Sequence, residues 1–130
     1  MGIKSVLAFL ALGLAAMASA QTANYPNRPV TLIVPAGAGG GTDVVARVLA
    51  DELGKRLGQA VVVDNKTGAS GMLGTQAVAR AAPDGHTLLV AYSTPIFYAH
   101  HIFAKVPYDI RKDFEFISQL AATSLVMMVN

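Results

Sequence analysis

The sequence of 130 residues contains no cysteine. This absence excludes a disulfide framework, a thiolate metal site and a lipid-modified amino-terminal cysteine. The sequence also contains no cluster of Lys or Arg, and its 10 basic and 8 acidic residues leave it close to neutral. A near-neutral chain without a basic patch is not typical of nucleic-acid binding.

A long apolar run is lacking as well, because the uncharged stretch from Val6 to Ala18 is too short to span a bilayer comfortably. It follows the positive Lys4 and ends in the small residues Ala18-Ser19-Ala20. This pattern predicts that residues 1–20 are a secretory signal peptide, with cleavage after Ala20. For a bacterial chain we therefore expect the mature protein, residues 21–130, in the periplasm. Its nine basic and eight acidic residues mean that any anion site must act mainly through backbone dipoles.

What the sequence does contain is a strand, a glycine turn and a helix in succession over residues 30–57. Residues 30–34 are a short β-branched apolar run, which predicts a buried strand. The turn from Pro35 to Asp43 follows, and apolar residues then recur at helical spacing up to Leu57. We expect Thr42 or Asp43 to cap this helix and Gly58 to end it.

Two similar units follow along the chain. Residues 60–64 predict a second strand, a glycine turn over 65–71 and a helix over 72–81 capped by Ser70. Residues 87–92 predict a third strand, followed by a turn at 93–95 and a helix over 96–104 that Thr94 caps and Pro95 opens. Residues 116–120 and 124–129 predict two further short strands.

Three successive strand–loop–helix units predict an α/β fold with a parallel sheet and flanking helices. The turns after the three strands should then meet at one edge of the sheet, which we call the rim. In open parallel sheets this carboxyl edge is where ligands bind. Glycines allow a close approach to a ligand, and the first N–H groups of a helix attract anions.

The residues expected at the rim offer backbone N–H groups and small hydroxyls rather than reactive side chains. The hydroxyls belong to Thr42, Ser70, Ser93 and Thr94. This set suits the binding of a carboxylate without chemistry, because hydrogen bonds to a charged acceptor contribute roughly 1.5–3 kcal/mol each.

Other kinds of site fit the sequence less well. A dinucleotide fold would use Gly37-Ala38-Gly39 and the acid Asp64, but Thr42 stands where the third glycine belongs. A P-loop fails because no Gly-Lys-Ser/Thr follows. His100 and His101 are adjacent and should point apart, so we expect no metal site. Ser70 lacks the G-x-S-x-G spacing of a hydrolase.

The motifs resemble those of the Bug/TctC receptors, the extracytoplasmic solute-binding proteins of tripartite tricarboxylate transporters. The matching segments are YPNRPVTLIVPAGAGGGTDVVARVLADELGKRLGQAVVVDNKTGASG, AVARAAPDGHTLLVAYST and KVPYDIRKDFEFIS, within residues 25–130. The resemblance implies a two-lobed clamshell, of the type II periplasmic-binding-protein kind, that closes on a carboxylated metabolite. It implies delivery of this solute to a membrane permease rather than catalysis, with no cofactor and no metal.

The resemblance also maps a ligand site onto this sequence. The first ligand loop corresponds to Gly39, Gly40, Gly41, Thr42 and Asp43, the second to Ser70 and Gly71, and the third to Ser93 and Thr94. Family members are more than twice as long, so we expect residues 21–130 to form a truncated first lobe that binds ligand weakly or not at all alone. The alternatives are a non-functional fragment of such a receptor and an exported α/β enzyme or dinucleotide-binding protein.

Overall fold

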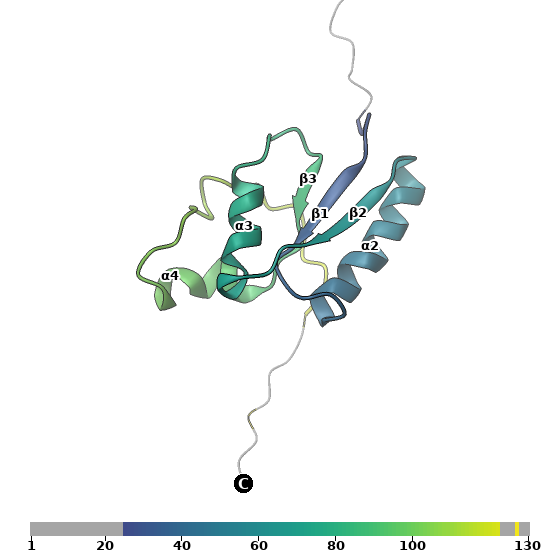
Figure 1. Ribbon diagram of the computed structural model, residues 1–130. Coiled ribbons are helices and arrows are strands. Elements are labelled where there is room, and N and C mark those ends of the chain that lie inside the picture. Colours follow the sequence, from purple (N-terminus) through teal and green to yellow (C-terminus); the bar gives the residue numbers. More distant parts are fainter. Residues whose placement is uncertain (1–24, 123–126, 128–130) are drawn as a thin grey trace, which may run out of the picture.

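A computed structural model describes residues 25–122 and Met127 (Figure 1). Short strands alternate with helices along the chain. In order, the elements are β1 (Val30–Val34), α2 (Gly41–Leu57), β2 (Val61–Asn65), the 3-10 turn η2 (Ala69–Gly71), α3 (Met72–Ala79), β3 (Thr87–Leu89), the π-helical turn η3 (Thr94–Tyr98) and α4 (Ala99–Ile102).

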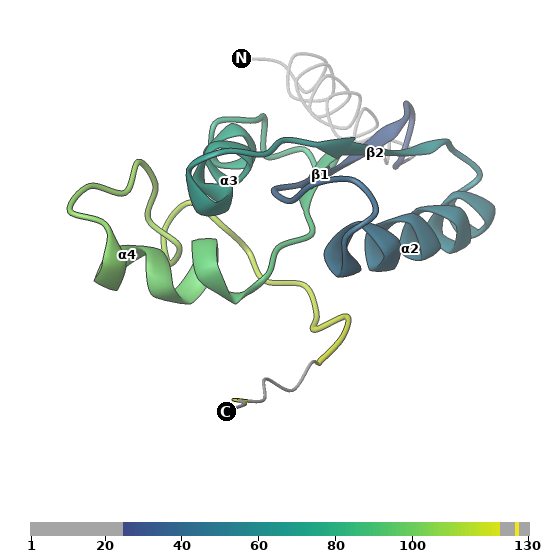
Figure 2. The same cartoon turned by 60° about the horizontal axis from the view of Figure 1, so that its bottom comes forward.

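The three strands form one parallel sheet in the order β2-β1-β3. In the register, Val34 lies opposite Asn65 and Ile33 opposite Leu89, so the three carboxyl ends share one edge. Helices α2 and α3 lie on opposite sides of the strands (Figure 2). The expected α/β fold with a parallel sheet and flanking helices is confirmed, as is the shared edge.

The core forms where β1 meets α2. Val30, Leu32 and Val34 alternate along β1 and are fully buried, and they pack with Ala46 and Ala50 of α2. Because β1 is the central strand, its other face is largely covered too, and Ile33 on that face is also buried. This packing fixes the start of α2 relative to the end of β1.

A second apolar cluster lies beside α3 and α4. It contains Met72, Ala99, Tyr108 and Ile110, with half-buried residues packed around them. Tyr108 and Ile110 come from the irregular segment after α4, so this segment is held against the helices by burial of its apolar side chains.

The boundaries of the first helix differ from those expected. α2 begins at Gly41 with Gly40 as its N-cap, and no side chain caps it, so neither Thr42 nor Asp43 is the cap. The end is as expected: Gly58 adopts φ +67°, and its N–H donates to the carbonyl of Gly54 at 3.0 Å.

Later boundaries shift as well. Ser70 does not cap α3, whose N-cap is Gly71. The third strand ends at Leu89 rather than at residue 92, and the third helical segment begins at Thr94 rather than being capped by it. The ends of helices and strands are what local sequence specifies least, so differences of a few residues arise there.

Residues 116–120 form no strand and are exposed, so that prediction is wrong for this structure. Phe116 and Ile117 pair with no described strand, and an apolar run needs such a partner to become part of a sheet. The strand expected at 124–129 lies outside the described residues except for Met127. No helix within residues 25–122 is long and apolar enough to cross a membrane.

Candidate ligand-binding rim

The first loop of the rim is open and rich in glycine. Gly37, Gly39 and Gly41 are exposed, and a methyl group built on any of them would meet no atom within 4 Å. Gly39 adopts φ +81°, a conformation that glycine takes without strain. The loop therefore has room for a ligand and little side-chain packing of its own.

The start of α2 offers hydrogen-bond donors to this space. The first bond of this helix start runs from the N–H of Val44 to the carbonyl of Gly40 at 3.0 Å. Within the described part of the chain, the N–H groups of Gly41, Thr42 and Asp43 donate to no protein acceptor. These are the orphan donors of a helix amino terminus, where the helix dipole adds partial positive charge.

The side chain of Asp43, unlike its backbone N–H, is fully hydrogen-bonded within the protein. The side chain is only 2% exposed, and its carboxylate accepts hydrogen bonds from the N–H of Gly39 at 2.8 Å and from Arg47 Nε at 2.9 Å. Asn65 Nδ2 donates to it at 2.9 Å. Arg47, then Gly39 and Asn65, hold the pKa of Asp43 well below its ordinary value, so this carboxylate stays ionised at neutral pH.

The second loop packs directly against the other two. Gly71 is buried at φ +90°, and a methyl group built there would lie 2.9 Å from the hydroxyl oxygen of Tyr92, 3.1 Å from Pro95 Cγ and 3.3 Å from the carbonyl oxygen of Pro35. Pro35 follows β1, whereas Tyr92 and Pro95 follow β3. The structure thus brings the bases of all three loops together at Gly71.

Residues just before Gly71 adopt an uncommon backbone conformation. Ala69 has φ +47° and Ser70 has φ +55°, which are left-handed values that cost non-glycine residues about 1–2 kcal/mol each. Ser70 is exposed at the rim, with its hydroxyl available to solvent. Such strain often occurs at functional sites.

The third loop starts the π-helical turn. Ser93 is exposed and Thr94 is half-buried at the start of η3, while Pro95 is fully buried. The hydroxyl of Tyr108 donates to the carbonyl of Pro95 at 2.7 Å, and burial raises the pKa of this phenol. This buried hydrogen bond holds the third loop against the segment that follows α4.

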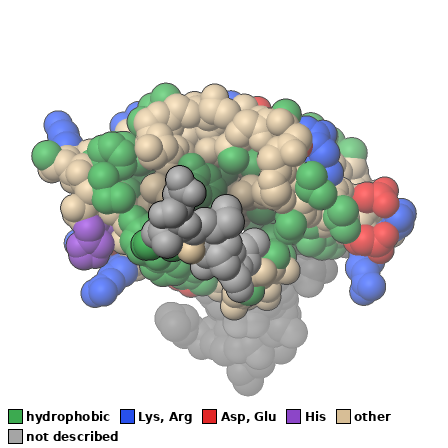
Figure 3. Space-filling view, turned by 90° about the horizontal axis from the view of Figure 1, so that it is seen from below, with side chains coloured by type: hydrophobic (Ala, Val, Ile, Leu, Met, Phe, Trp, Pro, Cys, Tyr) green, Lys and Arg blue, Asp and Glu red, His purple; other side chains and the backbone are tan. Residues whose placement is uncertain are grey.

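The end of the molecule with the rim is shown in Figure 3. Where grey atoms do not cover it, the middle consists of backbone and uncharged side chains, and the charged side chains lie toward the margins. This distribution agrees with the expectation that an anion here would meet backbone dipoles rather than a net positive field.

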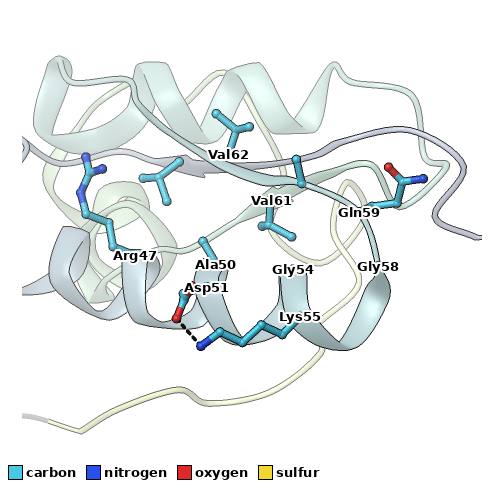
Figure 4. A pocket seen from close by; sticks show the side chains of 11 residues that line it. Arg47, Ala50, Asp51, Gly54, Lys55, Gly58, Gln59, Val61 and Val62 are labelled. Atoms are coloured by element: carbon cyan, nitrogen blue, oxygen red, sulfur yellow. Dashed lines mark hydrogen bonds and ion pairs between the residues drawn. The ribbon is translucent and has the colours of Figure 1, made fainter.

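A separate shallow groove of about 830 Å³ runs between α2 and β2 (Figure 4). Its lining includes residues of α2 from Arg47 to Lys55, the connection from Gly58 to Ala60, and Val61 to Val63 of β2. None of the residues expected at the ligand site line it. The groove is open to solvent along the edge strand, so we place the candidate site at the rim.

Sequence reasoning missed four residues that hold the rim in place: Arg47, Asn65, Tyr92 and Tyr108. Asn65 had a usable signal, since it is a polar residue at the carboxyl end of an apolar strand. Tyr92 and Tyr108 had none, because their partners are distant in sequence.

The described residues contain no group of three or more His, Asp or Glu side chains that could hold a metal ion. His86 lies instead in the turn before β3, where its side chain is buried against Tyr25. Asp64, the acid that a dinucleotide site would use, pairs with Lys66 at 2.9 Å.

A parallel sheet with open helix amino termini and glycine loops at one edge is the architecture of a ligand-binding α/β lobe, as found in periplasmic binding proteins. Residues 45–130 match the model of the family described as tripartite tricarboxylate transporter family receptor, TctC. The chain belongs to this family of periplasmic solute-binding receptors, and the resemblance noted in the sequence is confirmed.

Relatives of known sequence support this membership. Protein BugT of Bordetella pertussis is 44% identical over 119 residues, which are 91% of this chain and 36% of BugT. A UPF0065 protein from the gbd 5' region of Cupriavidus necator is 44% identical over 120 residues, 92% of this chain and 36% of that protein. The chain thus spans about a third of the length of these relatives.

Two solved structures are also similar. MatC (Rpa3494) from Rhodopseudomonas palustris with bound malate is 46% identical, with a TM-score of 0.67 over 69% of this chain and 31% of MatC. Rpa4515 from R. palustris with adipate is 34% identical, with a TM-score of 0.65 over 67% of this chain and 29% of that chain.

Proposed function

We propose that this chain is the first lobe of a periplasmic receptor that captures a small dicarboxylate or tricarboxylate at the rim. The receptor delivers the solute to the permease of a tripartite tricarboxylate transporter. The residues that contact the solute are Gly39, Gly40, Gly41, Thr42, Asp43, Ser70, Gly71, Ser93 and Thr94.

The observation that carries this proposal is the set of unpaired N–H groups at Gly41, Thr42 and Asp43, beside loops that meet at Gly71. A carboxylate is the natural acceptor for such donors. Two structurally similar proteins contain malate and adipate, which are both dicarboxylates. The contribution of Asp43 is through its N–H, because its carboxylate is already occupied within the protein.

Binding without catalysis fits the same residues. The hydroxyls of Ser70 and Ser93 donate no hydrogen bond to a histidine in the described structure, so neither has the adjacent base that activates a serine nucleophile. We therefore propose a receptor rather than an enzyme.

We further propose that this chain alone binds its solute weakly. The first loop is exposed to solvent on its outer side, and water screens the charge of a bound carboxylate. Isothermal titration of the chain with malate checks this point, and micromolar affinity would contradict it.

A two-dimensional ¹⁵N–¹H NMR titration with malate tests the site itself, because it detects weak binding residue by residue. We expect the amides of Gly41, Thr42, Asp43, Gly71 and Thr94 to shift progressively. The dimethyl ester of malate is the matched control, since it keeps the carbon skeleton but removes the charge, and it should produce no shifts. Malate-induced shifts confined to the α2–β2 groove, or none at all, would overturn the proposal.

A further inference from the structure

The buried carboxylate of Asp43 ties three separate elements together. Its Oδ2 atom accepts from the N–H of Gly39 in the loop and from Arg47 Nε, one turn later on α2. Its Oδ1 atom accepts from Asn65 Nδ2, at the end of β2. Both oxygens are therefore engaged inside the protein.

Asn65 extends this network to the beginning of the first loop. Its Nδ2 atom also donates to the carbonyl of Ala36 at 3.0 Å, and its Oδ1 atom accepts from Arg47 Nη2 at 3.2 Å. The loop from Ala36 to Gly39 is thus bonded at both ends to the Asp43–Asn65–Arg47 cluster, which we call the latch.

Beyond Ala36, which packs against the β1–α2 core, the glycine part of the loop has few other restraints. Methyl groups built at Gly37, Gly39 and Gly41 would point into open space, so no packing restrains these residues. The additional hydrogen bond within the loop, from the N–H of Gly40 to the carbonyl of Gly37, is long at 3.3 Å. A glycine-rich loop has high conformational entropy, so the hydrogen bonds of the latch are the main restraint on the glycines of the loop.

We propose that Asp43 is a positioning residue that presets the first loop and the amides of Gly41 and Thr42 for ligand binding, without its side chain contacting the ligand. This inference rests on the proposed function. Preorganising a binding loop raises affinity because the ordering cost is met before the ligand arrives. The charge of Asp43 is balanced by Arg47, so a ligand carboxylate can approach the same helix end.

The test compares Asp43→Asn with two control variants by the malate titration. Asp43→Asn replaces one acceptor oxygen by a donor that faces the N–H of Gly39 or the amide of Asn65, and we expect affinity to fall about tenfold. Asp51→Asn, on the same helix but paired only with Lys55 on the surface, should stay within about twofold. Val61→Ala weakens the packing at the far end of the sheet without touching the latch, so it controls for lost stability.

The chemical shift of the wild-type Gly39 amide, followed against pH, tests the hydrogen bond to Asp43 directly. This measurement does not depend on the stability of any variant. Because the pKa of Asp43 is held low, the Gly39 resonance should stay constant from pH 7 to pH 4. A change with a midpoint near the ordinary aspartate pKa of 3.8, already visible at pH 4, would overturn the latch. Should Asp43→Asn fail to fold, Asn65→Ala serves in its place with the same expected loss.

The outcomes separate the two proposals. Equal malate affinity in wild type and Asp43→Asn overturns the positioning role and leaves the proposed function intact. Absence of malate-induced shifts in the wild-type chain overturns the proposed function, and the Gly39 pH profile then decides the latch alone. A loss of affinity in Val61→Ala equal to that in Asp43→Asn also overturns the positioning role.

Discussion

Gly71 is the position at which one added methyl group should disturb the whole rim. It is buried where the loops that follow the three strands meet, and it adopts φ +90°. Replacing it with alanine adds a Cβ atom that would lie 2.9 Å from the hydroxyl oxygen of Tyr92 and 3.1 Å from Pro95 Cγ. We expect Gly71→Ala to be strongly destabilising.

The expected magnitude has two parts. A left-handed conformation costs an L-residue about 1–2 kcal/mol. Alanine also lowers the entropy of the unfolded chain relative to glycine, and this offsets about 0.4–1 kcal/mol of that cost. Overpacking a tight interior site costs about 1–3 kcal/mol more. The free energy of unfolding should therefore fall by about 2–4 kcal/mol, a large share of the roughly 5–15 kcal/mol typical of a domain.

Two other glycines allow the cost of the left-handed backbone and the cost of crowding to be measured separately. Gly58 has φ +67° and open space around it, so Gly58→Ala tests the backbone conformation alone and should cost about 1 kcal/mol. Gly74 lies within α3, and its added methyl would be 2.6 Å from the carbonyl oxygen of Lys66 and 2.9 Å from Pro35 Cβ. Gly74→Ala therefore tests crowding without a left-handed backbone; the crowding should cost about 1–3 kcal/mol, offset by the roughly 0.5–1 kcal/mol that alanine gains over glycine within a helix.

Urea unfolding followed by circular dichroism measures all three variants against the wild-type chain. An unchanged dependence on urea would show that the variants unfold the same surface. The amides of Thr94 and Tyr92 should shift in Gly71→Ala but not in Gly58→Ala. If Gly71→Ala costs no more than Gly58→Ala, then Tyr92 and Pro95 do not crowd this position, and the convergence of the loops is refuted.

Three further predictions concern the second loop, the third loop and acid stability. Ser70→Gly should raise the free energy of unfolding by about 0.5–1 kcal/mol because φ is +55° there, whereas Ser93→Gly, at φ −62°, should lower it. Urea titration measures both variants, and changes of the same sign would contradict the left-handed conformation of Ser70. Tyr108→Phe should lower stability by about 1 kcal/mol by removing its buried hydrogen bond, and an unchanged urea midpoint would contradict this. The pKa of Asp84 is lowered from 3.8 to about 2, chiefly because the N–H of His86 donates to it. This carboxylate therefore stabilises the fold above about pH 4, and that contribution is lost as the pH falls toward 2. In urea titrations from pH 4 to pH 2, the free energy of unfolding of Asp84→Asn should fall less steeply than that of the wild type. An equally steep fall in both would contradict this role of Asp84.

The sequence alone determined the repeated strand–loop–helix plan and the shared edge of the sheet. The β-branched run of β1 and the helical spacing of α2 are local patterns, and the stop at Gly58 needs only the freedom of glycine. Because parallel strands must cross over in one hand, three such units sufficed to predict that their loops meet at one edge.

Only the tertiary structure decided how the loops are held. Asp43 looked like a helix cap in the sequence, but in the fold its carboxylate bonds to Asn65, from the end of the neighbouring strand. Gly71 looked like an ordinary turn glycine, but its lack of a side chain is what lets Tyr92 and Pro95 approach. Such choices depend on residues distant in sequence that meet only after the sheet forms, so no local pattern encodes them.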